Sequence, residues 1–404
     1  MPPLAGPRAL QVSRTLARLA RLGWPSTVVC VDPRPGGPLL RDASGGGAFA
    51  ADGVDLVRVP SPEESAWCRA AFRMLPPFGR LPDRQQVWIG AATRAAGHRM
   101  NAAGHNVIVS FAQPWSDHLI GLRLHRTHRL PWVAHFSDPW TDSPYLRGSP
   151  WLRARWARME ADVVRDANAL VFVTPQTADA VMRKYPDAWR RKAHVVPHGY
   201  DREQVATIVP EARGQARRLR IAYTGRFYPG LRTPEPLLEA IAEVCASGTV
   251  TDEIEVRLLG PEMSRYEAQV RALGLESVVV LGERVSHADA LRAAATADVL
   301  LVVDAPSRTP SLFLPSKLVD YLMWRKPILG LTPPQGATAD LLRRLGCPLV
   351  APDDVAGIAS AIEALVSAWR AGGLQVSDTF DEVAREFDIE RTTAGLAQIL
   401  DQWA

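Results

Sequence analysis

The sequence contains few cysteines, and they lie far apart. Its 404 residues include only four, at positions 30, 68, 245 and 347, and no two of them form a CxxC pair. This spacing argues against a zinc site and against a disulfide framework. We interpret the four side chains as small hydrophobic groups of the core.

Long apolar runs are absent as well. No stretch approaches the roughly 18 residues that a membrane-spanning helix requires. The opening residues, MPPLAGPRAL, lack the uninterrupted apolar region of a signal peptide. No repeat of solenoid period is visible. These absences favour a cytoplasmic protein.

Lysine is scarce, because the 47 basic residues include only Lys184, Lys192, Lys317 and Lys326 as lysines. The net charge of +4 is slight for this length, and no nucleic-acid recognition module accompanies it, which argues against a nucleic-acid partner. Hydrophobic residues make up 47% and charged residues 22%, as in ordinary globular proteins. A chain of this length predicts two domains of roughly 200 residues each.

Short apolar runs rich in valine, leucine and isoleucine alternate with longer amphipathic segments. This pattern is typical of parallel strands that crossover helices bury on both faces, so we expect an α/β protein with one doubly wound sheet in each half. Strands are expected at residues 27–32, 55–60, 106–111, 131–136, 169–174 and 193–198, and then at 219–224, 254–259, 277–282, 298–303, 327–332 and 347–351.

The domain boundaries follow from the same pattern. We expect an N-terminal domain at 1–200, a polar linker at 201–218, a C-terminal domain at 219–385, and a C-terminal helix at 386–404 that could pack back on the first domain. The first domain opens on a loop and a helix instead of the usual strand. It either lacks its first strand or has one upstream of the given sequence.

Ligands of parallel sheets bind where strands end and helices begin. After the strand at 219–224 the chain reads GRFYPGLRTPEP, in which Gly225 permits close backbone approach and Arg226 and Arg232 precede a helix. Two guanidinium groups would suit a diphosphate, since each can bond two oxygens and stays charged. The alternative is two solvated arginines in an arginine-rich chain.

The stretch LPSKLVDYL follows the strand at 298–303 and begins a helix near Ser316, which could cap it. Lys317 in the first turn opposes the helix dipole, so a bound anion would make its charge favourable. Asp320, one turn later, could accept hydrogen bonds from vicinal sugar hydroxyls. A plain surface pair between Lys317 and Asp320 is the alternative.

Four segments together resemble a known family. Their order and spacing are similar to those in the C-terminal domains of retaining glycosyltransferases of family 4. The segments are TGRFYPGLRTPEPLLEAI, RLLGPE, VVVLGERVSHADALRAAATADVLLVV and LPSKLVDYLMWRKPILGL. The resemblance implies the GT-B fold, with two doubly wound Rossmann-like domains facing a central cleft. It also implies transfer of a sugar from a nucleotide diphosphate donor with retention of configuration and without a bound metal or other cofactor. The acceptor would be a glycan, a lipid-linked molecule or a small molecule, in cell-surface polysaccharide or glycoconjugate synthesis.

The resemblance assigns roles to individual residues of the second half. Arg226 matches the family's arginine after the strand, and Arg232 lies one residue later than its usual lysine; together they would hold the donor diphosphate. Asp320 stands where the family has the second glutamate of its E-x7-E motif, which holds the ribose. The backbone around Arg284 and Val285 would hold the base.

One position departs from that pattern. The first glutamate of the motif would fall at Leu312, which puts the contacts to the donor hexose in doubt. The chain instead resembles a branch with PSK before the helix, so Ser316 and Lys317 would take over contacts to phosphate or sugar.

In the first half, LPWVAHFSDPW resembles the strand that carries the family's active-site histidine. This places His135 beside the transferred sugar, whereas a locally satisfied strand-end histidine is the alternative. Asp138 could bind donor or acceptor sugar, or cap a turn. Gly6 would correspond to the glycine loop near the donor phosphates, and His198 would shape the hinge.

Residues 147–158 form a basic aromatic segment that could lie on an anionic membrane next to a lipid-linked acceptor, peripheral to the inner face of the cytoplasmic membrane. Solvated arginines around core-facing tryptophans are the alternative. Two rival functions remain open, namely a nucleotide-sugar epimerase of the same fold and a catalytically silent binding subunit, the latter motivated by Leu312.

Overall fold

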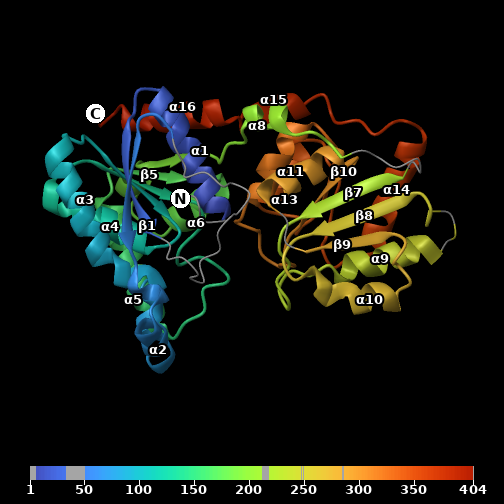
Figure 1. Ribbon diagram of the computed structural model, residues 1–404, viewed down its shortest axis with the longest axis horizontal. Coiled ribbons are helices and arrows are strands. Elements are labelled where there is room, and N and C mark those ends of the chain that lie inside the picture. Colours follow the sequence, from blue (N-terminus) through green and yellow to red (C-terminus); the bar gives the residue numbers. More distant parts are fainter. Residues whose placement is uncertain are drawn as a thin grey trace. The chain divides into compact units, whose positions relative to one another are not determined.

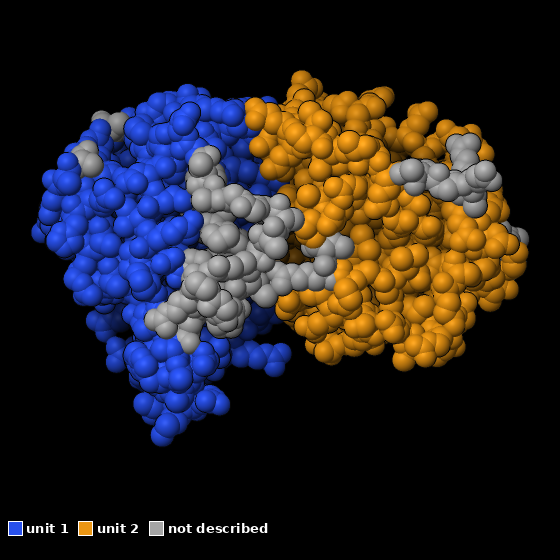
Figure 2. Space-filling view, in the orientation of Figure 1, with its two compact units in different colours: residues 1–199, 389–404 blue, residues 200–388 orange. Residues whose placement is uncertain are grey.

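The computed structural model describes residues 6–32, 51–211, 218–246, 248, 250–283 and 286–403. Within it the chain forms two compact units (Figure 2). Unit 1 comprises residues 1–199 and 389–404, and unit 2 comprises residues 200–388. The chain therefore leaves unit 1, completes unit 2, and returns to unit 1 for its last helix.

Unit 1 contains two parallel sheets. One pairs β1 (Ser26–Asp32) with β2 (Val54–Pro60), and the other has the order β3 (Ile108–Ala112), β4 (Trp132–Phe136), β5 (Ala169–Phe172) and β6 (Ala193–Val195). The expected single sheet is thus divided, since no strand among the described residues joins β1 to β3. The first element among the described residues is a helix, α1 (Pro7–Arg21), as expected from the sequence, and it precedes β1.

Unit 1 also contains helices, several of which pack against its two sheets (Figure 1). They are α1, α2 (Ala66–Met74), α3 (Ile89–Ala103), α4 (Ser116–His128), α5 (Pro150–Asp166), α6 (Pro175–Met182), α7 (Asp187–Arg190) and α16 (Ile389–Leu400), with 3-10 turns η1 (Pro62–Glu64), η2 (Phe78–Arg80) and η3 (Arg84–Trp88). Successive strand side chains point to opposite faces. Accordingly, Trp132 and Phe136 join the core under α3 and α4, whereas Val133 joins Leu19 of α1 and Leu396 of α16 on the other face.

Unit 2 is one six-stranded parallel sheet with the order β12-β11-β10-β7-β8-β9. The strands are β7 (Leu219–Thr224), β8 (Ile254–Leu259), β9 (Val279–Gly282), β10 (Val299–Val303), β11 (Ile328–Leu331) and β12 (Leu349–Val350). The strand order reverses between β7 and β10, and in such sheets ligands bind outside the carboxyl ends of the strands at that switch point.

The helices of unit 2 lie on both faces of this sheet (Figure 1). They are α8 (Arg202–Thr207), α9 (Glu235–Ala246), α10 (Glu267–Ala272), α11 (His287–Thr296), α12 (Ser316–Tyr321), α13 (Ala337–Arg344), α14 (Val355–Arg370) and α15 (Phe380–Arg385), with 3-10 turns η4 (Met263–Tyr266) and η5 (Leu322–Trp324). Residues 201–218 were expected to form a linker between the domains. Within this range, residues 202–207 fold as α8 and belong to unit 2.

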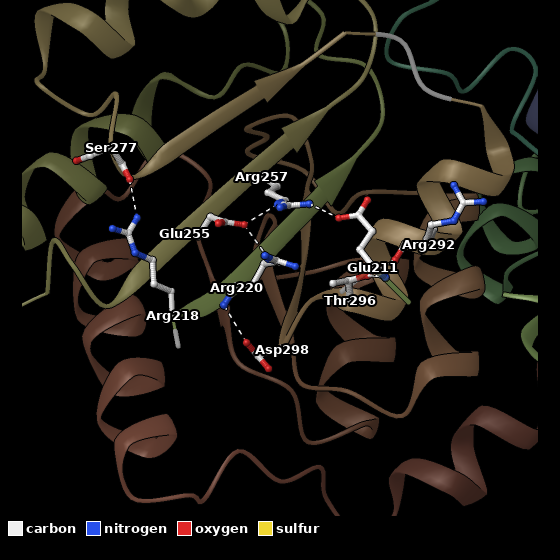
Figure 3. Close-up of polar contacts among 9 residues, drawn as sticks. All are labelled: Glu211, Arg218, Arg220, Glu255, Arg257, Ser277, Arg292, Thr296 and Asp298. Atoms are coloured by element: carbon white, nitrogen blue, oxygen red, sulfur yellow. Dashed lines mark hydrogen bonds and ion pairs between the residues drawn. The ribbon is translucent and has the colours of Figure 1, made fainter. Parts of the chain in front are cut away.

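A charged network lies near the amino ends of β7 and β8 (Figure 3). Glu255 Oε1 accepts hydrogen bonds from Arg220 Nε at 2.7 Å and from Arg257 Nε at 2.5 Å. Arg257 also donates to Glu211 at 2.7 Å, and the Glu211 backbone N–H donates to Thr296 of α11 at 2.9 Å. The network joins the segment before β7 to the sheet and to α11.

Candidate functional site

The loops after β7 and β8 meet through two glycines. Gly225 follows β7 with φ +143°, a value that side-chain-bearing residues rarely adopt, and its N–H donates to Leu259 O at 2.8 Å. A Cβ atom at Gly260 would collide with the carbonyl oxygen of Gly225, which is a backbone atom with no room to move aside. Glycine at 260 therefore lets the two loops touch at the carboxyl edge of the sheet.

Lys317 lies against the first of these loops. It occupies the first turn of α12, and its Nζ is 3.7 Å from the centroid of the Tyr223 ring. A Cβ at Gly225 would collide with this Nζ. The Nζ atom is buried and has no hydrogen-bond partner. Burial lowers the pKa of Lys317 well below its usual value, Arg232 lowers it further, and Asp304 opposes the shift.

Asp304 is a residue that sequence reasoning missed. It directly follows β10, it is buried, and it accepts a hydrogen bond from Thr332 Oγ1 at 3.0 Å. Burial raises the pKa of its carboxyl group. The same rule that selected the loops after strands would have selected it. It lines a pocket of about 210 Å³ together with Gly230, Leu231, Thr233, Pro236, Pro306 and Pro352.

The two arginines of the loop after β7 are close together. The Arg226 side chain is exposed, and its carbonyl oxygen accepts hydrogen bonds from Tyr223 Oη at 3.0 Å and from Arg232 Nη2 at 2.8 Å. The Arg232 guanidinium stacks over Tyr228 at 5.1 Å, and its buried Nε has no hydrogen-bond partner. The side chains of Arg232 and Lys317 thus lie near the end of β7, whereas Arg226 contributes its carbonyl oxygen to these contacts and exposes its side chain.

Other residues proposed for unit 2 have mixed outcomes. Pro315, and not Ser316, occupies the N-cap of α12, and no side chain caps this helix, so the capping role of Ser316 was wrong. Asp320 lies half-buried on α12; because Lys317 Nζ makes no hydrogen bond, the surface-pair alternative is not favoured. Arg284 and Val285 lie outside the described residues.

In unit 1, His135 lies at the carboxyl end of β4 in a group of aromatic rings. The residue is 6% exposed, and its ring centroid is 5.0 Å from that of Phe111 and 5.8 Å from that of His198. Its Nδ1 has no hydrogen-bond partner. Burial, helped by Arg8, lowers the pKa of His135 to about 3, and burial likewise lowers that of His198 well below its usual value. Both rings are therefore neutral at physiological pH.

Arg8 of α1 completes this group and was also missed by sequence reasoning. Its guanidinium donates to Ser137 Oγ, which is in turn 3.2 Å from His198 Nε2. Burial lowers the pKa of Arg8 to about 10, although Asp138 and Asp117 oppose the shift. A lone arginine after a proline gave no sequence signal for this contact.

Asp138 follows β4 and faces the loop after β3. It accepts a hydrogen bond from Gln113 Nε2 at 3.2 Å, and burial raises the pKa of its carboxyl group. Gly6 is the N-cap of α1 and is exposed, and a Cβ atom added to it would meet no other atom within 4 Å, so no close approach requires glycine there. Neutral imidazoles beside a carboxyl and a guanidinium can donate and accept hydrogen bonds with sugar hydroxyls.

Comparison with known proteins agrees with this arrangement of two parallel-sheet units. The profile of the glycosyl transferase 4-like domain matches residues 9–199, and that of glycosyl transferases group 1 matches residues 218–368. The chain belongs to the GT-B glycosyltransferases. Among curated protein sequences none matches it significantly.

Solved structures show the same GT-B fold. Sucrose-phosphate synthase from Thermosynechococcus elongatus has a TM-score of 0.69 and 17% identity, over 98% of this chain and 94% of that chain. Anabaena Alr3699/HepE, solved with UDP, has a TM-score of 0.65 and 14% identity, over 98% and 97%. A Listeria monocytogenes protein provisionally described as a UDP-N-acetylglucosamine 2-epimerase has a TM-score of 0.61 and 11% identity, over 98% and 93%.

Two features are absent from the described part of this GT-B glycosyltransferase. None of its helices is both long and apolar enough to cross a bilayer. No group of three or more His, Cys, Asp or Glu side chains among the described residues could hold a metal ion.

Proposed function

We propose that this chain transfers a sugar from a nucleoside diphosphate sugar to an acceptor with retention of configuration. The observation that carries the proposal is the buried Lys317 Nζ, which has no hydrogen-bond partner and lies beside Arg232 at the switch point of the sheet. A buried ammonium group needs a counter-charge, and a diphosphate would supply it. The similarity to HepE, solved with UDP and with UDP-glucose, supports this class of donor.

The roles in unit 2 follow from charge. Departure of the diphosphate builds negative charge on its oxygens, and we assign Arg226, Arg232 and Lys317 to stabilise that charge, without a metal ion. Gly225, which lacks a side chain, permits close approach of the same anion, Ser316 offers its backbone N–H, and Asp320 binds the ribose hydroxyls.

The roles in unit 1 concern the sugar. Neutral His135 would hydrogen-bond the transferred sugar, and Asp138 would hold a donor or acceptor hydroxyl. Acceptor attack would occur on the face from which the diphosphate leaves, and the leaving phosphate would take the acceptor proton. A lipid-linked or glycan acceptor of cell-surface synthesis remains our expectation.

The first experiment tests donor class and turnover. The full chain is incubated with UDP-, GDP-, ADP- and dTDP-sugars, and release of nucleoside diphosphate is measured with and without a polyprenyl-phosphate-linked acceptor, together with the anomeric configuration of the product. Acceptor-dependent release with retention is expected. Tight binding without release would support the silent-subunit alternative, and a changed sugar without acceptor would support the epimerase.

A substitution tests the diphosphate assignment. Arg226→Ala should raise the activation free energy of transfer by about 2–4 kcal/mol, as for loss of a preorganised electrostatic group. The matched control is Arg265→Ala, because Arg265 is another exposed arginine of unit 2 and is paired with Glu262 on the surface. An unchanged kcat/KM in Arg226→Ala would remove this residue from the mechanism.

A further inference from the structure

One end of unit 1 exposes large apolar side chains. In α2 and the segment that follows it, Trp67 is 63% exposed, Met74 81%, Leu75 63% and Phe78 42%. Residues 73–78, Arg-Met-Leu-Pro-Pro-Phe, are all exposed. Single exposed apolar residues are ordinary, but a group of this size in one short segment indicates an interaction surface.

The inner side of the same segment explains why it is folded in this position. Cys68 and Phe72 are the buried residues of α2, and Phe72 packs against Phe78 with ring centroids 5.8 Å apart. The Ser65 side chain caps the helix by accepting from Cys68 N–H. The helix therefore packs one face against the unit and leaves the other exposed.

Part of α5 adjoins this segment. Trp156 Nε1 donates to Arg80 O at 2.6 Å, and the Arg80 guanidinium lies 5.6 Å from the Trp156 ring centroid. Trp156 and Leu152 are buried, so in α5 the core-facing alternative holds for these two side chains. Trp151, in contrast, is 52% exposed beneath the Arg155 guanidinium, and Tyr145 is 48% exposed.

The segment around α2 and the segment around the start of α5 carry positive charge only. Residues 65–82 and 143–159 contain no Asp or Glu. They contain arginines at positions 69, 73, 80, 147, 153, 155 and 158, all of them exposed. Apolar and cationic groups are thus mixed over one surface, which we call the tip surface and define as residues 66–80 and 145–158. Figure 1 shows α2 projecting at the lower end of unit 1 below α5, and Figure 2 shows the same projection.

We propose that the tip surface binds an anionic phospholipid membrane, with Trp67, Met74, Leu75 and Phe78 entering the headgroup region. Arginine side chains near such a membrane are attracted to its negative surface potential. Tryptophan and other large apolar side chains gain free energy by leaving water at the boundary between headgroups and acyl chains. The inference does not depend on the proposed sugar transfer.

The chemistry favours a membrane over two other occupants. A second copy of this chain would bring the seven arginines against an identical set, and like charges repel. A nucleic acid would match the arginines but would leave Met74 and Leu75 without an apolar partner. An anionic lipid surface accounts for both kinds of side chain.

Vesicle flotation of the full chain is the first test. Binding to vesicles of phosphatidylcholine mixed with phosphatidylglycerol is expected, with weak binding to phosphatidylcholine alone and loss at high salt. Arg69→Glu with Arg73→Glu, and separately Met74→Ser with Leu75→Ser, should each weaken binding at least about tenfold. Unit 2 supplies matched controls, because Arg265, Arg271 and Val209 are exposed there. Arg265→Glu with Arg271→Glu, and separately Val209→Ser, should bind like the unsubstituted chain.

A second measurement places the segment in the bilayer. Met74→Cys carrying an environment-sensitive dye should shift its emission to the blue on anionic vesicles, whereas Val209→Cys with the same dye should not. Equal binding by the α2 variants and the unsubstituted chain would overturn the proposal. So would tighter binding to duplex DNA than to anionic vesicles, or a dimer that the Met74 and Leu75 substitutions convert to monomer.

Discussion

The amino group of Lys317 is buried and has no hydrogen-bond partner. The Tyr223 ring offers a cation–π contact, and the carboxyl group of Asp304, which acts on Lys317 electrostatically, is hydrogen-bonded to Thr332. A cation–π contact contributes only about 2 kcal/mol when desolvated, which does not offset the cost of burying an ammonium group. The residue therefore lowers the stability of the unliganded protein in return for a strong site for an anion.

Replacing this side chain should separate stability from binding. We expect Lys317→Met to raise the free energy of unfolding of the unliganded protein by about 1–3 kcal/mol, because an apolar side chain of similar length replaces a buried amino group that has no hydrogen-bond partner. The same variant should lose affinity for nucleoside diphosphates. Thermal unfolding and calorimetric titration with UDP measure the two effects, and a less stable variant with intact affinity would contradict the interpretation.

Ligand binding at this residue should also take up protons. In the unliganded protein the pKa of Lys317 is well below its usual value because of burial and Arg232. A diphosphate in contact would raise that pKa, so at a pH between the two values the complex holds more protons than its free components, and affinity falls as pH rises through this window. Calorimetry in buffers of different ionisation enthalpy detects the uptake. Equal binding enthalpies in all buffers, or the same uptake in Lys317→Met, would contradict it.

At the scale of secondary-structure elements, most of the fold could be predicted from local pattern. All twelve strands lie at the expected positions within a few residues, because runs such as VLLVV at 299–303 are buried on both faces and read as continuous apolar stretches. The division of the unit 1 sheet could not be predicted, because strand pairing depends on neighbours that are distant in sequence. Of the tip surface, the sequence analysis identified the basic aromatic residues 147–158, which include part of α5, but not the exposed apolar residues of α2 and the segment after it.

The candidate site shows the same limit. Arg226, Arg232 and Lys317 were selected because they lie in segments that follow strands, and their assignment to the diphosphate stays a prediction; the structure places Arg232 and Lys317 close enough for their charges to interact. Arg8 was missed, since its contact with Ser137 spans 129 positions of the sequence and leaves no local signal.

The network of Figure 3 predicts unequal losses from two similar substitutions. Glu255 holds two guanidinium groups and is 19% exposed, whereas Glu211 holds one and is 42% exposed. Glu255→Gln should lower the free energy of unfolding of unit 2 by about 2–3 kcal/mol, since Arg220 and Arg257 would be left with like charges close together. Glu211→Gln should cost less than about 1 kcal/mol. Urea denaturation of both variants gives the comparison, and equal losses would show that the network is no stronger than a surface pair.

At the scale of the whole molecule, the chain passes between the units at two neighbouring points. Within unit 2, Tyr200 N–H donates to Phe387 O at 2.8 Å, and within unit 1 a Cβ on Gly199 would lie 2.5 Å from Ile389 Cα. Unit 2 is thus an insertion with adjacent ends, and unit 1 depends on a helix encoded after it.

Fragments of the chain should show that unit 2 folds by itself and that unit 1 depends on α16. Residues 200–388 alone are expected to fold and to bind a nucleoside diphosphate. Residues 1–199 should aggregate, because without α16 the apolar face around Leu19, Val133 and Val171 is open to water. Joining 199 to 389 by a short Gly-Ser linker should restore a soluble unit 1. Size-exclusion chromatography and circular dichroism distinguish these outcomes; a soluble, folded 1–199 fragment would show that α16 is dispensable.

The late position of α16 also sets the order of events during synthesis. Domains usually fold as they leave the ribosome, the N-terminal one first. Here the complete sequence of unit 2 emerges before the helix that closes unit 1, so one hydrophobic face of the nascent first unit stays uncovered until residues 389–400 are translated.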